Sequence, residues 1–364
     1  MEILSYLPVK SLIRFTCVCK SWLDLIRNDH QFDLTRTTSS SNVLDNIDCI
    51  FDQVAGSKEP CLYSFTERKT LRLLMKFDCA PTRIDFQESS SFVPEMPLWV
   101  SSSCHGIICF HLYTSSEILL CNPSIQEVVL IPPCPNDGSV RGFGFDPVNQ
   151  DYKVVAFSFF NGNLYSLREG RWRNLCVSST NFRYCNTYLR GHSALNGNGR
   201  ICNWLLAEEV GSEPVIMGPF GKRIILSFDM VEEVFKEVPM PECQDPTTHE
   251  HKLLSTTKWE ACISCIHHRH STSCEVWVLN ERSLPMLPLN LWLNDRELLF
   301  VVMKGQIREV HHYDLRTNQT KDTGRRGSLH RSMGGYVESL ISIKHLMSLY
   351  HTSYRKEIEV KALF

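Results

Sequence analysis

The sequence predicts a mainly β protein, with a small all-α module at residues 1–34 followed by a β-propeller-like domain at residues 43–364. Two observations support this prediction. In the first part, apolar residues recur at helical spacing. From residue 47 onward, short apolar strands alternate with polar turns. The Thr- and Ser-rich stretch between them, residues 35–42, is typical of a linker.

The N-terminal part predicts short helices. Pro8 suits a first helical turn, because its φ is fixed and it lacks an N–H. Ser21 is predicted to cap the next helix. The apolar positions of the two helices are Leu12, Ile13, Phe15, Val18, Trp22, Leu25 and Ile26. Helices this short are marginal alone, so we expect their apolar faces to serve a binding partner.

The β part contains a degenerate repeat of apolar strand, Asn/Asp/Ser turn and strand ending near Pro or Trp. One residue before each turn marks the repeat: Cys121, Tyr165, Phe228, Val278 and Tyr313. The markers are roughly 35 to 63 residues apart, around the roughly 40 to 50 residues of a four-stranded blade. The same strands also fit a β-sandwich, but the repeated internal order favours a propeller.

Three stretches of the β part fit the repeat poorly. Residues 43–100 are irregular, and residues 176–215 are predicted to be a long insertion, so the number of blades stays open. Leu71–Phe77 fits a strand and a helix equally well by periodicity.

The N-terminal motifs resemble the second and third helices of a plant F-box. They are, in order, Leu7-Pro8-Val9-Lys10-Ser11-Leu12-Ile13-Arg14-Phe15, Cys17-Val18-Cys19-Lys20-Ser21-Trp22 and Leu25-Ile26-Arg27. F-boxes of this kind begin with an acidic, leucine-rich first helix that ends in Glu-Ile-Leu. Here only Met1-Glu2-Ile3-Leu4 stands in that place. The truncated first helix indicates either a start upstream of Met1 or weakened adaptor binding.

Motifs of the β part resemble plant F-box-associated domains, which implies a kelch-type propeller for target recognition. The motifs are Ser103 to Cys109, Leu120-Cys121-Asn122-Pro123-Ser124, Gly142 to Pro147, Asp151 to Val155, Tyr165-Ser166-Leu167 before Arg171-Trp172, Leu226 to Asp229, Glu275 to Leu279 and Tyr336 to Leu340. Pollen S-locus F-box proteins belong to the same broad group, and these residues do not decide membership among them.

The resemblance implies a non-enzymatic substrate receptor of a cullin ubiquitin ligase. The helical module would bind a Skp-type adaptor, and through it a cullin, while the β domain would hold a target protein. The adaptor-binding positions, some in direct contact and some in support, would be Leu4, Leu7, Pro8, Leu12, Val18 and Trp22. Cys17 and Cys19 are expected to lie one buried and one near the adaptor surface.

The target-binding residues are not identified by the sequence. Because specificity is expected in loops on a rigid scaffold, four loops are candidates: Pro135–Val140, Asn181–His192, Gln244–His251 and Asn294–Glu297.

Composition excludes several classes of function. The formal net charge of −2 favours neither nucleic acid nor an anionic membrane. The sequence shows no apolar run long enough to cross a membrane and no signal peptide. Its 16 cysteines, scattered in apolar strands, are therefore interpreted as reduced core residues. We expect the protein in the cytoplasm, the nucleus or both.

No cofactor or metal is expected. Cys262 and Cys265 form a C-x-x-C near His267, but residues three apart on a strand point to opposite faces. The pair Gly142 and Gly144 lacks the third glycine and the helix of a dinucleotide loop, and a turn between strands explains it better. Two alternatives stay open: an interaction propeller uncoupled from the ligase, and an oxidase-type propeller enzyme with a Tyr, His and Cys metal site.

Overall fold

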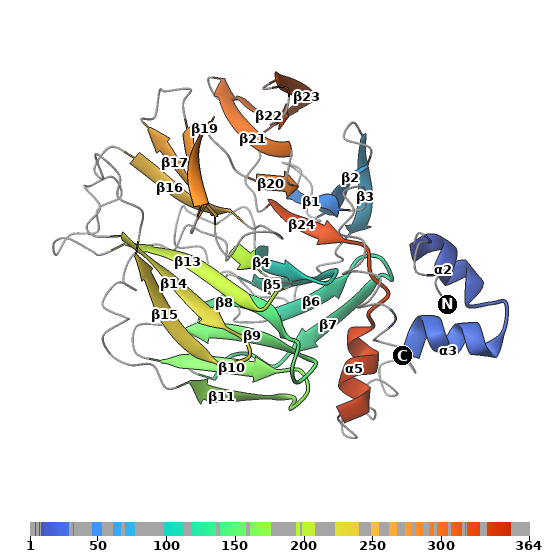
Figure 1. Cartoon of the computed structure of the whole chain (residues 1–364). Coiled ribbons are helices and arrows are strands. Elements are labelled where there is room, and N and C mark those ends of the chain that lie inside the picture. Colours follow the sequence, from blue (N-terminus) through green and yellow to red (C-terminus); the bar gives the residue numbers. More distant parts are fainter. Residues whose placement is uncertain are drawn as a thin grey trace, which may run out of the picture.

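The computed structural model contains helices α2 (Val9–Phe15), α3 (Lys20–Asn28) and α5 (Ile343–Tyr350) and a set of four-stranded sheets (Figure 1). The structure describes residues 4, 7, 9–28, 32, 46–52, 61–66, 70–76, 98–112, 118–135, 139–157, 161–175, 194–196, 199–207, 223–239, 249–254, 262–267, 274–278, 281–286, 291–294, 297–304, 307–314, 317, 319–327 and 333–350.

The described strands form six sheets, which we call blades 1 to 6, each with its strands in the order given. Blade 1 contains β24 (Met333–Val337), β1 (Asn46–Asp52), β2 (Cys61–Thr66) and β3 (Thr70–Lys76). Blade 2 contains β4 (Leu98–Cys104), β5 (Ile107–Leu112), β6 (Ile118–Asn122) and β7 (Glu127–Ile131). Blade 3 contains β8 (Ser139–Asp146), β9 (Asp151–Phe157), β10 (Gly162–Ser166) and β11 (Arg171–Leu175).

The other three blades follow the same plan. Blade 4 contains β12 (Ala194–Asn196), β13 (Ile201–Ala207), β14 (Arg223–Asp229) and β15 (Val234–Pro239). Blade 5 contains β16 (His249–Leu254), β17 (Cys262–His267), β18 (Cys274–Val278) and β19 (Glu281–Met286). Blade 6 contains β20 (Leu291–Asn294), β21 (Glu297–Lys304), β22 (Ile307–Asp314) and β23 (Gln319–Gly327).

The ring is closed by a strand from the far end of the chain. β24 pairs antiparallel with β1, with Val337 opposite Asn46 and Met333 opposite Ile50. β24 also lies beside β4 and β20, the first strands of the two neighbouring blades. The first strand of blade 1 therefore comes from the C-terminal part, and the other three come from the N-terminal part. The predicted propeller is confirmed, and the β-sandwich alternative is wrong, because the strands form separate blades rather than two stacked sheets.

The repeat seen in the sequence corresponds to one position in each blade. The five marker residues all lie on the third strand of blades 2 to 6, on β6, β10, β14, β18 and β22. The ambiguous segment from Leu71 is strand β3, and the predicted insertion at 176–215 contains β12 and β13. Two strands of blade 4 therefore lie in this stretch, and β12 gave no periodic signal because it is only three residues long. The insertion itself stays a prediction, because residues 176–193 lie outside the described residues.

The two ends of the propeller differ in their connections. At one end, which we call the turn face, the first strand of a blade turns into the second and the third into the fourth. Hydrogen bonds between blades 3 and 4 join these turns, from the Phe145 N–H to the Gly199 oxygen (3.0 Å) and from the Lys153 Nζ to the Met230 oxygen (2.7 Å). The other end, which we call the loop face, is where β11 ends at Leu175, β13 ends at Ala207 and β15 ends at Pro239.

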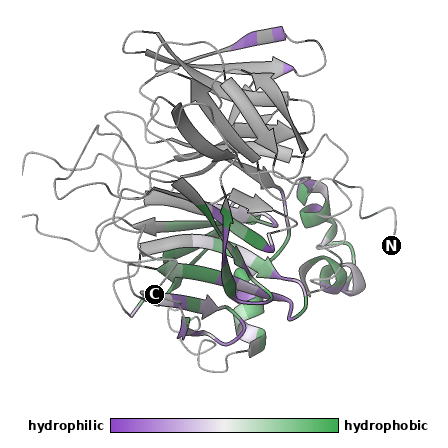
Figure 2. Cartoon of the chain, turned by 60° about the vertical axis from the view of Figure 1, so that its left-hand side comes forward, coloured by the Kyte–Doolittle hydropathy of each residue, from purple (hydrophilic) through white to green (hydrophobic). Residues whose placement is uncertain are grey.

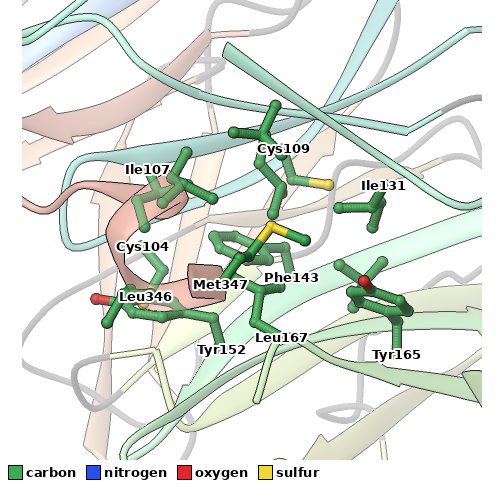
Figure 3. Close-up of a cluster of buried hydrophobic side chains, with 14 of the residues drawn as sticks. Cys104, Ile107, Cys109, Ile131, Phe143, Tyr152, Tyr165, Leu167, Leu346 and Met347 are labelled. Carbon is green, nitrogen blue, oxygen red and sulfur yellow. The ribbon is translucent and has the colours of Figure 1, made fainter. Parts of the chain in front are cut away.

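The described core lies between the blades. One cluster joins blades 2 and 3 with α5 and includes Phe143, Tyr152 and Met347, whose side chains converge in Figure 3. A second cluster joins blades 3 and 4 and includes Phe157, Trp204 and Phe228. Figure 2 shows hydrophobic residues concentrated in the described sheets and hydrophilic residues at their turns. Each blade thus buries its faces against its neighbours, as repeat architectures require.

The two glycines of the Gly142 and Gly144 pair lie within strand β8, not in a turn as predicted. A Cβ at Gly142 would lie 2.8 Å from Cζ2 of Trp204, and one at Gly144 would overlap the backbone oxygen of Gly199. The pair therefore permits blade 4 to approach blade 3 closely, which explains a glycine inside a strand.

Replacing Gly144 with alanine should lower the free energy of unfolding by about 1–3 kcal/mol, because the new methyl group must displace backbone in a packed contact. Urea denaturation of the purified protein measures this change. The control is Val148→Ala in the exposed turn that follows β8, where the side chain is 71% exposed and a change of no more than about 0.5 kcal/mol is expected. Equal stability of Gly144→Ala and the unaltered protein would contradict the close packing.

Candidate functional site

The turn between α2 and α3 is defined by local hydrogen bonds. The Thr16 N–H donates to the Leu12 oxygen (3.2 Å), and its Oγ1 donates to the Ile13 oxygen (2.7 Å). The Val18 N–H donates to the Phe15 oxygen (3.0 Å). Helix α3 begins at Lys20, and the Leu23 N–H donates to the Cys19 oxygen (3.0 Å). The predicted cap at Ser21 is therefore wrong, because that residue lies inside the helix.

The apolar residues of the two helices pack mainly on one another. The Phe15 and Trp22 rings lie 5.4 Å apart at 55°, and both contact a buried cluster that contains Val9, Leu12 and Ile26. Such tilted aromatic pairs add to the stabilisation from burial alone. The module therefore has a small core of its own, and its apolar residues are not all available to a partner.

The predicted adaptor-binding positions that the structure describes differ in how far they are buried. Leu4 and Leu12 are buried, so they can only support the module. Leu7 and Trp22 are partly buried against the same cluster. Val18 is 61% exposed and can contact a partner directly. Pro8 lies outside the described residues.

Residues 17–21, which we call the docking turn, are all exposed. They are Cys17, Val18, Cys19, Lys20 and Ser21. The prediction that one of the two cysteines is buried is wrong, because both thiols are exposed. The docking turn therefore presents one exposed branched apolar side chain, Val18, which a partner could bury without unpacking the core of the module.

Among the described residues, two from the turn face of the propeller pack into the core of the module. Leu340, three residues after β24, belongs to the buried cluster of the module, and Ile125 of the β6–β7 turn packs against that cluster. Figure 1 shows α2 and α3 beside the chain that runs from β24 to α5. Neither residue was predicted to contact the helical module. The motif Tyr336 to Leu340 was recognised, but its partner lies more than three hundred residues earlier.

The Asn-Pro-Ser signature holds the segment that carries Leu340. Asn122 is buried, and its Nδ2 donates to the Ser339 oxygen (3.2 Å), the Ser339 Oγ (3.0 Å) and the Ile341 oxygen (2.9 Å). Its Oδ1 accepts from the Ser124 N–H (3.0 Å), and the Ser124 Oγ accepts from the Ser339 N–H (3.2 Å). Buried polar groups are normally satisfied in this way. The signature is therefore a clamp on the C-terminal segment.

A buried ion network fixes blade 3 to blade 4 on the turn face. Lys153 is almost completely buried, and its Nζ lies 2.6 Å from Asp146 Oδ2 and 2.8 Å from Glu233 Oε1. Arg173 also forms an ion pair with Glu233. Burial alone would raise the pKa of Asp146, but hydrogen bonds from Lys153 and Asn149 hold it below its usual range. For Glu233, Arg173 and Lys153 lower the pKa in the same way, against burial.

Two further carboxylates stabilise turns of this face. Burial raises the pKa of Asp151, which accepts hydrogen bonds from Ser166 Oγ (2.5 Å) and the Arg168 N–H (2.9 Å). Burial opposes ionisation of Asp229 as well, but Arg200 and the Val231 N–H lower its pKa. These groups bridge strand ends rather than converge on a cavity, so they are structural ion pairs of the kind that also perturb pKa values.

Five cysteines of blades 2 to 4 whose side chains the structure describes are buried and form no disulfide: Cys104, Cys109, Cys121, Cys134 and Cys202. Burial raises the pKa of the Cys104 and Cys202 thiols and raises that of Cys121 to about 12. These thiols stay protonated at neutral pH, which makes them poor nucleophiles and metal ligands. They act as small apolar residues of the core, as the sequence analysis interpreted them.

The metal candidate lies on a strand of blade 5. Cys262, Cys265 and His267 belong to β17, and His268 to His270 lie outside the described residues. In the part of the chain that the structure describes, no three His, Cys, Asp or Glu residues lie together as a metal site would require.

The candidate target loops fall at both ends of the propeller. Pro135–Val140 connects β7 to β8 and reaches the loop face, but Ser139 and Val140 already belong to β8. In Gln244–His251, the residues from His249 onward belong to β16, so the loop is shorter than predicted. Asn294–Glu297 joins β20 to β21 and therefore lies on the turn face. Asn181–His192 lies outside the described residues.

The fold and the site together define a β-propeller protein with a small helical module packed on its turn face. A family model described as the F-box associated beta propeller domain matches residues 60–325, and an F-box domain model matches residues 1–33. The chain belongs to this family of F-box-associated propeller proteins, which confirms the resemblance to plant F-box proteins.

The relatives agree with this assignment. An F-box/kelch-repeat protein of Arabidopsis thaliana is 26% identical over 298 residues, which cover 77% of this chain and 74% of that protein. An F-box protein of the same plant is 24% identical over 316 residues, which cover 76% of this chain and 67% of that protein. Among solved structures, TolB from Acinetobacter baumannii is 10% identical with a TM-score of 0.44, covering 85% of this chain and 69% of that chain.

Among the described residues, none of the helices combines the length and the apolar composition that a membrane crossing needs.

Proposed function

We propose that the protein is a non-enzymatic substrate receptor of a cullin ubiquitin ligase. The docking turn binds a Skp-type adaptor, and the loop face of the propeller holds a target protein. The observation that carries this proposal is the exposed Val18, presented by helices whose other apolar residues pack into the module. Membership in the F-box family supports the choice of partner.

The receptor contributes proximity rather than chemistry. Holding a target on the same particle as the ubiquitin-charged enzyme raises the effective concentration of the target's lysines. The module occupies the turn face through Leu340 and Ile125, which leaves the loop face free for a target. The target class is a protein, and the receptor works in the cytoplasm or the nucleus, where such ligases assemble.

Replacing Val18 with aspartate should weaken adaptor binding by about 2 kcal/mol or more, roughly 30-fold in Kd, because a charge replaces an apolar anchor. Isothermal titration with a purified Skp-type adaptor measures this loss. Val18 is a better position for this test than Leu12. Leu12 is buried, so a charged residue there would unfold the module and abolish binding indirectly. The matched control is Val148→Asp, an exposed valine of the propeller, which should leave the Kd unchanged.

Two outcomes would point elsewhere. If Val18→Asp and the unaltered chain bind the adaptor equally, the docking turn is not the contact. If the unaltered, folded chain does not bind at all, the alternative of an interaction propeller uncoupled from the ligase takes its place.

A further inference from the structure

The segment between β24 and α5 crosses the boundary between the propeller and the module. We call residues 338–342 the strap. Two adjacent residues of the strap are buried in different cores. Leu340 belongs to the cluster of the module, whereas Ile341 belongs to the cluster of blades 2 and 3. The strap therefore joins the two cores through adjacent residues.

Hydrogen bonds to a buried side chain also hold the strap in this position. Ser339 is fully buried, and its backbone oxygen accepts from Asn122 Nδ2. The Ile341 oxygen accepts from the same nitrogen. One amide group therefore fixes the backbone on both sides of Leu340. An amide nitrogen with two N–H donors can serve these neighbouring oxygens, and a carboxylate of the same shape cannot.

A second anchor lies at the end of the strap. Glu127 Oε2 accepts from Ser342 Oγ (2.8 Å), and its Oε1 accepts from the Lys344 N–H (2.7 Å). Ser342 in turn caps α5, with its Oγ accepting from the His345 N–H (3.1 Å). A carboxylate near the first N–H groups of a helix is a favourable pairing. Both anchors, Asn122 and Glu127, come from the same turn of blade 2.

We propose that Asn122 and Glu127 are positioning residues that hold the helical module at a fixed place on the turn face. They act through Leu340, whose side chain enters the core of the module. The consequence for the ligase rests on the proposed function: a fixed module sets where the loop face lies relative to the adaptor. The joint itself is independent of any partner and can be measured in the isolated chain.

The test compares the unaltered full chain with Asn122→Asp. The variant keeps the oxygen that accepts from Ser124 but replaces the donor nitrogen by an oxygen that faces two carbonyl oxygens. The matched control is Gln126→Glu, which adds the same charge to an exposed residue of the same turn. A pair of dyes at the exposed positions 21 and 148 reports the distance between module and propeller by single-molecule energy transfer.

We expect one narrow distance distribution in the unaltered chain and in Gln126→Glu, and a broad one in Asn122→Asp. Amide hydrogen exchange should be at least about tenfold faster in the strap and α2 of Asn122→Asp, since local opening is no longer opposed by the clamp. Exchange in β8 to β11 should not change, which a general loss of stability would not allow. An unchanged distance distribution and unchanged exchange in Asn122→Asp would overturn the proposal.

A second variant covers the case in which Asn122→Asp unfolds the propeller. Leu340→Ala leaves the clamp intact and removes only the side chain that enters the module, and it should broaden the distribution in the same way. Leu340→Met, which keeps an apolar side chain of similar size, should restore the narrow one. A narrow distribution in Leu340→Ala would overturn the proposal. Adaptor binding by the unaltered chain is a separate measurement, so failure of the proposed function would not be mistaken for failure of the joint.

Discussion

Replacing Lys153 with methionine should lower the free energy of unfolding by about 3–5 kcal/mol at neutral pH, the usual result of removing one partner of a buried ion pair. The side chain of Lys153 is 4% exposed, and its Nζ contacts Asp146, Glu233 and the Met230 oxygen. Methionine fills a similar volume but leaves the Asp146 carboxylate buried beside an apolar group. Urea denaturation at pH 7 measures the loss.

The pH dependence of the free energy of unfolding provides a second, independent test of this prediction. The pKa values of Asp146 and Glu233 are lowered in the folded protein. Their contribution to stability is therefore present above the pKa values of the unfolded chain, about 4, and is lost as the pH falls through the lowered values. Protonated carboxyl groups are uncharged, so they no longer form ion pairs with Lys153. The difference between Lys153→Met and the unaltered protein should thus be largest at neutral pH and shrink below about pH 4.

Two controls separate the ion network from a general effect of losing a lysine. Lys236→Met removes an exposed lysine of β15, where a change within about 0.5 kcal/mol is expected. The double variant Lys153→Met/Asp146→Asn removes both charges, so it should be more stable at neutral pH than Lys153→Met alone. A Lys153→Met protein as stable as the unaltered one at pH 7 would show that the network contributes nothing.

The third strands were predictable because their turns are encoded locally. Asn122 and Asp229 end the third strands β6 and β14, and each accepts from the backbone N–H two residues later, at 3.0 Å and 2.8 Å. Asn and Asp favour turns for this physical reason. A short window of sequence therefore contains the strand, the turn residue and the next strand.

The closure of the ring and the clamp were not predictable in this way. The pairing of β24 with β1 joins residues at opposite ends of the chain. The Asn-Pro-Ser motif was recognised in the sequence. The sequence does not show, however, that the Asn122 side chain donates to the backbone oxygens of Ser339 and Ile341. Likewise, helical spacing placed Leu12 and Val18 among the apolar positions of the module. It did not show that Leu12 is buried and that Val18 is exposed. Local patterns predict which residues are apolar, whereas long-range packing decides which of them a partner can reach.

Replacing Trp204 with alanine should lower the free energy of unfolding by about 3–5 kcal/mol, the usual cost of removing a large aromatic side chain from a core. Trp204 lies on β13, in the stretch that the sequence analysis predicted to be an insertion. Its side chain is buried, and its ring lies 5.1 Å from Phe157 at 81°. Trp172 serves as the control, because it is only partly buried on the outer strand β11. Trp172→Ala should cost less than half as much.

A double-mutant cycle with Gly142 tests the packing that makes Trp204 important. A Cβ at Gly142 would lie 2.8 Å from the Trp204 ring in the unaltered protein, so Gly142→Ala alone should be destabilising. In the Trp204→Ala background the ring is absent, and Gly142→Ala should cost much less. Residues in contact commonly show interaction energies of about 0.5–3 kcal/mol. Additive effects would mean that blades 3 and 4 do not meet at this pair, and that Trp204 stabilises blade 4 alone.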